Sequence, residues 1–586
     1  MEKNEVLLKS NNEWLHFTNP HCIISATSID NVRDSLREVE RLVNANNWHA
    51  AGFVSYEAAP AFDNALHVRV TSDFPLVWFG LYSEPQTLKT SDVFTHRALR
   101  EDIGNLIPLN WRASIERESY NAAIEKIKDH IAHGRTYQVN YTMRLNSEFK
   151  NKEWELFLNL TQNQNKYAAY IDTGSNVICS ASPELFFKLD GDKIYGNPMK
   201  GTVKRGKTTR EDKEQAEWLH DSAKNRAENV MIVDMIRNDI GRIAEIGSVH
   251  VPELFKIEKY STLFQMTSTV QAKTHASIDE IFTALFPCGS ITGAPKVSTM
   301  NIISELETTP RKIYTGSIGY IAPNRKAQFN VTIRTVLIDR ESEIAEYGVG
   351  GGIVWDSTST DEYDEAILKA QVLTQSEPEF SLIETILWTP EEGYFLLDKH
   401  IARIQDSAKY FDFTFSREKF ETHLNELATK FKSVQRVRVL LNKFGELNSE
   451  TKDIQIQKGA FKVRLAEQPI NSQEVFLYHK TTRREMYPFI AESSSKSKTK
   501  PDDILLYNEN NQLTEFTIGN LVVEINNQLV TPLISCGLLP GTFRAHLLET
   551  GKIKEQVIHK DELEKCSKIF LINSVRKWVE VLPLIT

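Results

Sequence analysis

The sequence predicts an α+β protein of two domains, and three observations support this fold class. Alternating apolar segments separated by turns, at 312–323, 327–339 and 344–356, are typical of antiparallel strands. Amphipathic helical segments are mixed with these strands. The strands arrive in meanders, which favours a large antiparallel sheet over a series of β–α–β units.

Length and composition set the class of protein. The chain has 586 residues, so at about 100–200 residues per domain we expect two to four structural units. Hydrophobic residues make up 41% and charged residues 25%, as in soluble globular proteins. Asp and Glu outnumber Lys and Arg by 78 to 69, a net charge of −9, which argues against nucleic acid as a partner.

Targeting signals and cysteine pairs are not visible in the sequence. No run of about 18 apolar residues predicts a membrane span, and the N-terminus lacks a secretory pattern. The five cysteines are scattered without a Cys-x-x-Cys pair, which excludes a disulfide scaffold and a cysteine-rich zinc site. We therefore expect a cytoplasmic protein, in a reducing compartment.

The domain boundary is expected at 374–380, a polar stretch with a proline that follows a helical segment. A new alternating pattern then begins at 381–388 and turns at 389–393, which predicts a hairpin. The predicted domains are accordingly 1–375 and 380–586, and both are expected to be α+β.

Individual elements follow from apolar spacing and from capping residues. A helix is expected over 119–134, with Ser119 as its N-cap and Gly134 at its end, and another over 225–243. In the second domain we expect strands at 437–442, 474–480, 503–508 and 521–530, several of them joined by Asn-rich turns.

Four segments of the first domain carry candidate chemistry, at 181–206, 225–243, 286–307 and 348–370. Taken singly, Lys200 in the first segment and Glu228 in the second are ordinary solvated residues. The third joins a small-residue turn to a helix, whose free N–H groups suit an anion.

The fourth segment places Glu362 and Glu365 on one helix face. Together with a third carboxylate they would suit Mg²⁺, whereas an ion pair between Glu365 and Lys369 is the plain alternative.

Together these segments resemble the chorismate-utilising enzyme family, which includes anthranilate, isochorismate and salicylate synthases and component I of aminodeoxychorismate synthase. The resemblance runs from 134–141 to residue 370, with a weaker match at 52–63. It implies chorismate as substrate and a large chorismate-binding α+β sandwich with its site between two sheets.

One position sorts the members of that family. Lys200 stands in Pro-x-Lys-Gly-Thr where anthranilate-type members have alanine, so the resemblance implies the aminodeoxychorismate synthase type with Lys200 as covalent nucleophile. Attack of this amine at C2 with loss of the C4 hydroxyl, then attack of ammonia at C4, gives retention by two inversions. Glu184 matches the general acid of the family.

The resemblance assigns further residues. Gln138 stands where members that add water have a lysine base, which favours ammonia as nucleophile. Glu228 and Glu365 match Mg²⁺ ligands, with Glu362 nearby or acting through water. Gln265 departs from the histidine of many members. The residues implied around the substrate are Thr292, Lys296, Tyr314, Arg334, Gly350 and Lys369.

Ammonia would come from another chain. A glutaminase needs a nucleophilic cysteine in a strand–turn–helix elbow with a histidine partner, and no such setting is visible. Cys288 comes nearest, but the family resemblance accounts for its loop. We expect a separate glutamine amidotransferase subunit.

The second domain carries signals at 399–404, 476–487, 513–523 and 538–544. In this order they resemble fold-type IV pyridoxal-phosphate enzymes, which comprise branched-chain and D-amino-acid aminotransferases and aminodeoxychorismate lyase. The resemblance spans 381–586 and implies that Lys480 binds pyridoxal 5′-phosphate covalently, while Glu515 keeps its pyridine nitrogen protonated. Further implied contacts to the cofactor are Arg403, Thr517, Asn520, Thr542 and Ser574.

The two resemblances support each other, because the first domain would make the substrate of the second. Residues 479–487 look more like the lyase than the aminotransferases. The sequence is interpreted as a bifunctional enzyme that makes 4-aminobenzoate from chorismate for folate. The alternatives are anthranilate or isochorismate synthesis with an aminotransferase, against which Lys200 and Gln138 speak, and a degenerate ligand-sensing protein. A homodimer through the second domain is a further expectation.

Overall fold

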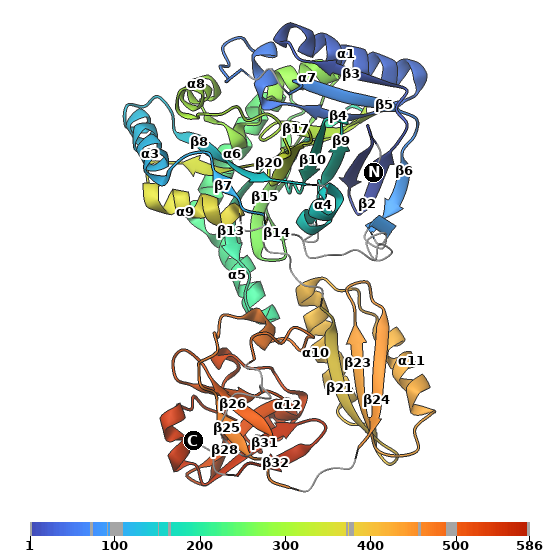
Figure 1. Ribbon diagram of the computed structural model, residues 1–586, viewed down its shortest axis with the longest axis vertical. Helices are drawn as coiled ribbons and strands as arrows, with labels where there is room; N and C mark the ends of the chain where they lie inside the picture. Colours follow the sequence, from blue (N-terminus) through green and yellow to red (C-terminus); the bar gives the residue numbers. More distant parts are fainter. Residues whose placement is uncertain are drawn as a thin grey trace. The chain divides into compact units, whose positions relative to one another are not determined.

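The chain folds into two compact units (Figure 1). The computed structural model describes residues 3–70, 74–90, 92–93, 109–150, 152–161, 166–370, 373, 380–454, 459–487 and 501–582. Unit 1 comprises residues 1–204 and 216–377, and unit 2 comprises residues 205–215 and 378–586. The expected boundary at 374–380 lies outside the described residues except for Phe380.

Unit 1 contains two ten-stranded antiparallel sheets, which confirms the predicted large antiparallel sheet. The first sheet holds β1 (Val6–Ser10), β2 (Glu13–Phe17), β6 (Gln86–Lys89), β7 (Arg112–Ala113), β8 (Gln138–Glu148), β9 (Ala169–Asp172), β10 (Asn176–Ser180), β16 (Gly293–Ala294), β19 (Thr335–Asp339) and β20 (Ile344–Ile353). The second holds β3 (Cys22–Ala26), β4 (His49–Val54), β5 (Val77–Tyr82), β11 (Leu185–Asp190), β12 (Lys193–Asn197), β13 (Met199–Lys204), β14 (His250–Lys259), β15 (Leu263–Lys273), β17 (Ser317–Ala322) and β18 (Lys326–Asn330).

The lateral order of the strands puts distant parts of the sequence side by side. The first sheet runs β16-β8-β20-β19-β10-β9-β1-β2-β6, with β7 beside β8. The second runs β13-β15-β12-β11-β18-β17-β4-β5-β3, with β14 beside β15. Strand β8 therefore pairs with β20, about 200 residues further along the chain.

The two sheets face each other across an apolar layer, and helices cover their outer faces. Val6 and Leu8 of the first sheet pack in one cluster with Phe53 and Ile318 of the second. The helices against the first sheet are α3 (Arg117–Ala132), α4 (Glu153–Thr161), α8 (Lys296–Leu306) and α9 (Ser359–Ala370). Those against the second are α1 (Ile29–Asn46), α6 (Ala223–Gly241) and α7 (Ile278–Leu285).

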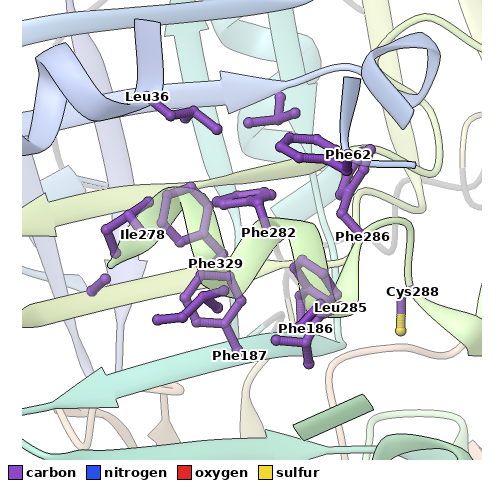
Figure 2. Close-up of a cluster of buried hydrophobic side chains, with 14 of the residues drawn as sticks. Leu36, Phe62, Phe186, Phe187, Ile278, Phe282, Leu285, Phe286, Cys288 and Phe329 are labelled. Carbon is purple, nitrogen blue, oxygen red and sulfur yellow. The ribbon is translucent and has the colours of Figure 1, made fainter. Parts of the chain in front are cut away.

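A cluster of aromatic side chains supports the chain where α7 ends (Figure 2). The rings of Phe187 and Phe282 each lie 5.1 Å from the ring of Phe329, and Phe286 packs against Phe282. Burial of these rings stabilises the fold because it removes a large apolar area from water, and the edge-to-face ring contacts add to this. Cys288 lies at the margin of this cluster, so the cluster anchors the start of the loop that follows.

Two expectations for unit 1 need correction. Helix α3 begins at Arg117 with Glu116 as N-cap, not with Ser119, because its polar first turn carries no apolar signal. The segment 327–339 is not one strand. It forms β18 and β19 in different sheets, and Arg334 between them has a left-handed backbone with φ 52°.

Unit 2 contains two smaller sheets. The four-stranded sheet has the order β22 (Gly393–Tyr394), β21 (Leu382–Thr389), β23 (Gln435–Leu441) and β24 (Leu447–Asp453), and α10 (Leu397–Phe411) and α11 (Arg417–Ala428) pack on it. The eight-stranded sheet holds β25 (Val463–Leu465), β26 (Asp503–Tyr507), β27 (Leu513–Phe516), β28 (Gly519–Ile525), β29 (Gln528–Thr531), β30 (Lys554–Glu555), β31 (Lys568–Asn573) and β32 (Lys577–Glu580). Helix α12 (Thr542–Glu549) packs against β28 and β31.

The expected hairpin at 381–397 is present, but two expected strands need correction. The segment 521–530 is not one strand, because β28 ends at Ile525 and β29 begins at Gln528. Asn526 and Asn527 both have positive φ, as a tight turn between β28 and β29 requires. The segment 474–480 was expected to be a strand. It contains a 3₁₀ turn at Val475–Leu477. Residues 476–479 are all buried, so the segment carries no alternation from which a strand could be told from a turn.

One segment predicted in the first domain belongs to unit 2 by its contacts. Arg205 forms a bidentate ion pair with Asp212 at the start of α5 (Thr209–Asp221), and its guanidinium lies 4.2 Å from the ring of Tyr410. The Tyr410 hydroxyl donates to the carbonyl of Gly206 at 2.6 Å. Residues 205–215 are thus an integral part of unit 2, and the sequence boundary missed them because the segment is discontinuous with 378–586.

Among the described helices, none combines the length with the apolar character that crossing a bilayer requires.

We predict that Asp212→Asn destabilises unit 2. The Arg205 side chain is 5% exposed, so loss of its counter-charge should cost on the order of 3–5 kcal/mol of unfolding free energy. The matched control is Glu214→Gln, which removes an exposed ion pair with Arg210 on the same segment and should change little. Calorimetry that finds equal melting temperatures for both variants would contradict the predicted role of the buried pair.

Candidate functional site

Lys200 lies on β13, at the edge of the second sheet of unit 1. Its Nζ is 4.0 Å from Oε2 of Glu228 on α6, and the lysine side chain is 30% exposed. Asn229, the next residue on α6, donates from its side chain to the carbonyl of Lys200 at 3.3 Å. Helix α6 therefore supplies both a countercharge and a backbone anchor for this lysine.

Gln265 holds the two residues after Lys200. Its Nε2 donates to the carbonyl of Gly201 at 2.9 Å, and its Oε1 accepts from the Thr202 hydroxyl at 3.0 Å. Sequence reasoning noted this residue only as a departure from histidine. The contact depends on the pairing of β13 with β15, which places Thr202 opposite Gln265.

Glu184 is buried between β10 and β11, and burial raises the pKa of its carboxyl to about 7, although a hydrogen bond from Ser290 and the charge of Lys200 oppose the rise. The Ser290 hydroxyl donates to Oε1 at 2.8 Å and lies 3.2 Å from the thiol of Cys288. A carboxyl with this pKa can hold a proton near neutral pH and give it up, as an acid catalyst must. Sequence reasoning missed Ser290.

Glycines of β20 make room for polar side chains. A Cβ at Gly351 would lie 3.1 Å from an oxygen of Glu362, and one at Gly352 would lie 2.7 Å from Nε2 of Gln138. Gln138 is buried, and its Oε1 has no hydrogen-bond partner among the described residues. An unsatisfied buried amide oxygen is suited to a ligand that donates a hydrogen bond.

The two carboxylates of α9, Glu362 and Glu365, each contact another side chain of the protein. Glu365 pairs with Lys369 at 2.7 Å, which is the ion pair considered from the sequence, and Ser357 donates to Glu362 at 2.6 Å. Burial and the charge of Glu365 raise the pKa of Glu362. Within the described ranges, no group of three His, Cys, Asp or Glu residues is arranged to hold a metal, so the carboxylates of Glu228, Glu362 and Glu365 form no closed three-residue site.

The other residues expected around the substrate differ in whether their side chains already contact other groups of the protein. Thr292 is buried and its hydroxyl donates to the carbonyl of Cys288 at 3.1 Å. The ammonium of Lys296 lies 3.3 Å from the carboxylate of Asp239 on α6. Arg334 forms no ion pair with any described residue, so its guanidinium is available to a carboxylate.

Tyr314 and Lys369 are two further residues that the sequence predicts around the substrate. The ring of Tyr314 lies under the guanidinium of Arg144 at 5.2 Å, and the Lys369 ammonium donates to the carbonyl of Gly350 at 3.1 Å. The candidate residues of unit 1 therefore include three lysines (Lys200, Lys296 and Lys369), a protonatable carboxyl at Glu184, the carboxylates of α9 and the guanidinium of Arg334.

In unit 2, Lys480 follows the buried residues 476–479. Burial and the positive charge of Arg403 lower the pKa of its amine to about 8. Its backbone is held by the N–H of Ile383, which donates to the Lys480 carbonyl at 2.8 Å. An amine with a lowered pKa is more often neutral near pH 7, as condensation with an aldehyde requires.

Glu515 lies on β27 of the eight-stranded sheet of unit 2. Burial raises the pKa of its carboxyl to about 8, and it accepts hydrogen bonds from the Tyr487 hydroxyl at 3.0 Å and from the Asn520 amide at 3.2 Å. A buried carboxyl without a cationic neighbour in hydrogen-bond contact suits a protonated ring nitrogen as partner. Tyr487 was not singled out from the sequence.

A cluster on α10, β21 and α12 offers an anion site. Thr542 begins α12, and Gly541 before it provides no side-chain cap for the free N–H groups. The guanidinium of Arg403 donates to Glu384 at 2.7 Å and to the Pro540 carbonyl at 3.3 Å. The cluster therefore brings a fixed guanidinium to the chain just before the start of α12.

Glu384 and His400, which sequence reasoning missed, hold this guanidinium in place. Burial opposes ionisation of Glu384, but Arg403 and His400 outweigh it and lower the pKa of the carboxyl to about 2. His400 Nε2 also lies 3.3 Å from the Thr542 hydroxyl. One buried carboxylate thus orients both Arg403 and His400.

Two hydroxyls expected to contact the cofactor, those of Thr517 and Ser574, donate hydrogen bonds to other groups of the protein. The Thr517 hydroxyl donates to Asp503, and the Ser574 hydroxyl donates to the Thr385 carbonyl at 3.2 Å. Asn520 bridges Glu515 and the Leu539 carbonyl. These groups stabilise the site, and none of the four hydrogen bonds excludes a further contact to a ligand.

Family models match both halves of the chain. Residues 3–375, more than half of the chain, match the model of chorismate binding enzymes. Residues 381–583 match the model of amino-transferase class IV.

Curated relatives match the first half. Aminodeoxychorismate synthase component 1 of Escherichia coli (strain K12) is 40% identical over 274 residues, which are 46% of this chain and 60% of the relative. That of Bacillus subtilis (strain 168) is 40% identical over 264 residues, 44% of this chain and 56% of the relative. The chain thus spans less than two thirds of the length of these relatives.

A solved structure supports the fold of unit 1. Anthranilate synthase component I from Streptococcus pneumoniae matches with a TM-score of 0.54 and 24% identity, over 64% of this chain and 93% of that one.

We predict that Ser290→Ala raises the pKa of Glu184 above its value of about 7, because the hydroxyl donates to the carboxylate and favours its charged form. Infrared or carbon-13 titration of the Glu184 carboxyl measures this. Ser298→Ala, which removes an exposed hydroxyl bonded to Arg135, is the control and should leave that pKa unchanged. An unchanged pKa in Ser290→Ala would refute the proposed contact.

Proposed function

The chain belongs to the chorismate binding enzyme family, and on this premise we propose that it makes 4-aminobenzoate from chorismate in two steps. Unit 1 replaces the C4 hydroxyl of chorismate with an amino group, and unit 2 removes pyruvate from the product. The observation that carries the proposal is the lysine at position 200, with Nζ 4.0 Å from Glu228 and its charge acting on the buried carboxyl of Glu184.

In the first step, the Lys200 ammonium gives up a proton to solvent and its neutral amine attacks C2 of chorismate. The ring double bonds shift toward C4, and the C4 hydroxyl leaves as water with a proton from Glu184. Ammonia then attacks C4, and the bond between Lys200 and C2 breaks. Each displacement inverts, so the C4 configuration is retained. The pKa of about 7 at Glu184 supports its role as the acid, because the carboxyl is partly protonated at neutral pH.

The paired carboxylates support a Mg²⁺ site in unit 1. Burial and, to a smaller extent, the charge of Glu365 raise the pKa of Glu362, and a bound cation would relieve both effects. Mg²⁺ commonly takes one or two protein carboxylates and fills its shell with water and substrate, so Glu228 and Glu365, with Glu362 nearby, are sufficient. When bound, the metal supplies positive charge at the ring carboxylate of chorismate.

The available guanidinium supports a carboxylate contact. We assign Arg334 to a carboxylate of chorismate, since it has no internal ion pair in the described part of the chain. Gln138 supports ammonia as nucleophile, because an amide cannot act as a base toward water. The remaining substrate contacts in the proposal are Thr292, Lys296, Tyr314, Gly350 and Lys369.

The geometry of unit 2 fits pyridoxal 5′-phosphate. Lys480 would bind it covalently, Glu515 would face its ring nitrogen, and Arg403 with the start of α12 would face its phosphate. Thr517, Asn520, Thr542 and Ser574 line the remaining contacts in the proposal. When bound, the cofactor supplies the electron sink that allows pyruvate to leave. Lys480, with a pKa of about 8, takes the proton at C4.

The setting in the cell is part of the proposal. We assign the source of ammonia to a separate glutamine amidotransferase subunit, and we expect a homodimer through unit 2. None of the five cysteines is in a disulfide, which supports a cytoplasmic location.

The test of the proposal is product analysis. The purified chain, loaded with pyridoxal 5′-phosphate, is given chorismate, ammonium and Mg²⁺, and the products are separated by chromatography and mass spectrometry. We expect 4-aminobenzoate and pyruvate in equal amounts. Anthranilate as the main product would overturn the assignment of unit 1, and an aminated product with no pyruvate would overturn that of unit 2.

Lys200→Ala should lose nearly all formation of the aminated intermediate, because it removes the proposed nucleophile while the other two lysines of the site, Lys296 and Lys369, are held in ion pairs by Asp239 and Glu365. Chorismate consumption followed by chromatography measures this. Lys204→Ala, an exposed lysine of the same strand, is the control and should keep the wild-type rate. A Lys200→Ala variant with wild-type turnover would disprove the covalent role.

Lys480→Ala should lose the absorbance of the bound cofactor and nearly all 4-aminobenzoate, while it still consumes chorismate and accumulates the aminated intermediate. The reason is that no step proposed for unit 1 uses Lys480 or the cofactor. The exposed Lys462→Ala serves as control for unit 2. Wild-type production of 4-aminobenzoate by Lys480→Ala would show the lyase assignment to be wrong.

A further inference from the structure

A small pocket in unit 1 is used by neither proposed step. Its empty volume is about 210 Å³, including its open mouth. His67 and Arg69 lie at the exposed rim, whereas Tyr56, Glu57 and Arg311 are buried at the floor. The pocket therefore connects solvent with buried polar groups.

Two polar atoms at the floor lack a protein partner. Glu57 is 2% exposed, and its Oε1 accepts from the backbone N–H of Arg311 at 2.7 Å. Its Oε2 and the hydroxyl of Tyr56, also 2% exposed, have no hydrogen-bond partner among the described residues. Buried polar groups without partners cost free energy, so such atoms lining a pocket point to a bound small molecule.

The charges around the floor favour a neutral occupant. Arg144 and Arg311 both donate to the buried carboxylate of Glu307, and the guanidinium of Arg311 lies 4.7 Å from the ring of Tyr56. Burial raises the pKa of Glu57 to about 7, so the two arginines face either Glu307 alone or Glu307 together with ionised Glu57; in both states a further buried cation would be unpaired. Burial raises the pKa of Tyr56, so its hydroxyl keeps its proton and can donate it.

The pocket adjoins the wall of the proposed chorismate site. Arg311 donates to the carbonyl of Ile291 at 3.1 Å and to that of Asn140 at 2.7 Å. Ile291 precedes Thr292, and Asn140 lies two residues after Gln138 on β8. One arginine thus separates the floor of the pocket from residues assigned to substrate binding.

We propose that this pocket binds neutral ammonia before it reaches chorismate. Glu57 Oε2 accepts an N–H of ammonia, and the Tyr56 hydroxyl donates to its lone pair. Ammonium has no lone pair and cannot make the second contact. No covalent bond forms or breaks in the pocket. This inference rests on the proposed function, because only that function requires ammonia.

The test uses Tyr56→Phe in the full-length chain. The variant deletes a hydroxyl for which the described residues offer no hydrogen-bond partner, so it should not lower the melting temperature. We expect the KM for ammonium at saturating chorismate to rise about two- to tenfold, as for the loss of one hydrogen bond, with the KM for chorismate unchanged. Tyr120→Phe is the matched control, since it also deletes a buried hydroxyl without a partner, outside the pocket.

A second variant addresses the carboxylate. Glu57→Gln keeps an oxygen that accepts from Arg311 but can present an amide donor toward the ligand, so the KM for ammonium should rise here as well. Equal KM values for ammonium in Tyr56→Phe, Tyr120→Phe and the wild type would show that the pocket holds water only, and would overturn the inference. A wild-type chain that consumes no chorismate with ammonium would overturn the proposed function itself, and this inference with it.

Discussion

The buried carboxylate of Glu307 joins the segments of unit 1 that carry the proposed substrate-binding residues. It accepts the backbone N–H and hydroxyl of Thr142 and the guanidinium groups of Arg144 and Arg311. Burial alone would raise the pKa of Glu307, yet the two arginines outweigh burial and lower it. Removal of one partner from such a group costs on the order of 3–5 kcal/mol, because a charge is left buried. The wall of the candidate site therefore depends on this one network.

The two lysines assigned to catalysis lie in different environments. Lys200 is on an edge strand, 30% exposed and near Glu228, so its charge is compensated until a substrate binds. Lys480 is desolvated beside Arg403, which lowers its pKa to about 8. The contrast fits the tasks proposed for them, which are displacement of a hydroxyl for Lys200, and binding of an aldehyde and transfer of a proton for Lys480.

Much of the architecture could be predicted from periodicity and turns. The antiparallel sheets, the helix near 119–134 and the hairpin at 381–397 follow from local patterns, and Asn526 and Asn527 form the turn that their chemistry favours. The errors arose where burial on all sides removed the alternation, as at 474–480, and where one alternating run crossed from one sheet to the other. Residues 205–215 were assigned to the first domain because sequence adjacency says nothing about packing.

The sequence by itself determined the types of chemistry that this protein can carry, because Lys200, Glu184, Lys480 and Glu515 stand in recognisable local motifs. The tertiary structure alone decided which groups tune them. Ser290 reaches Glu184 from a loop 106 residues further on, and Tyr487 reaches Glu515 across the fold of unit 2. Such partners carry no local signal, since a serine or a tyrosine becomes a hydrogen-bond donor to a particular carboxyl only when packing brings the two together.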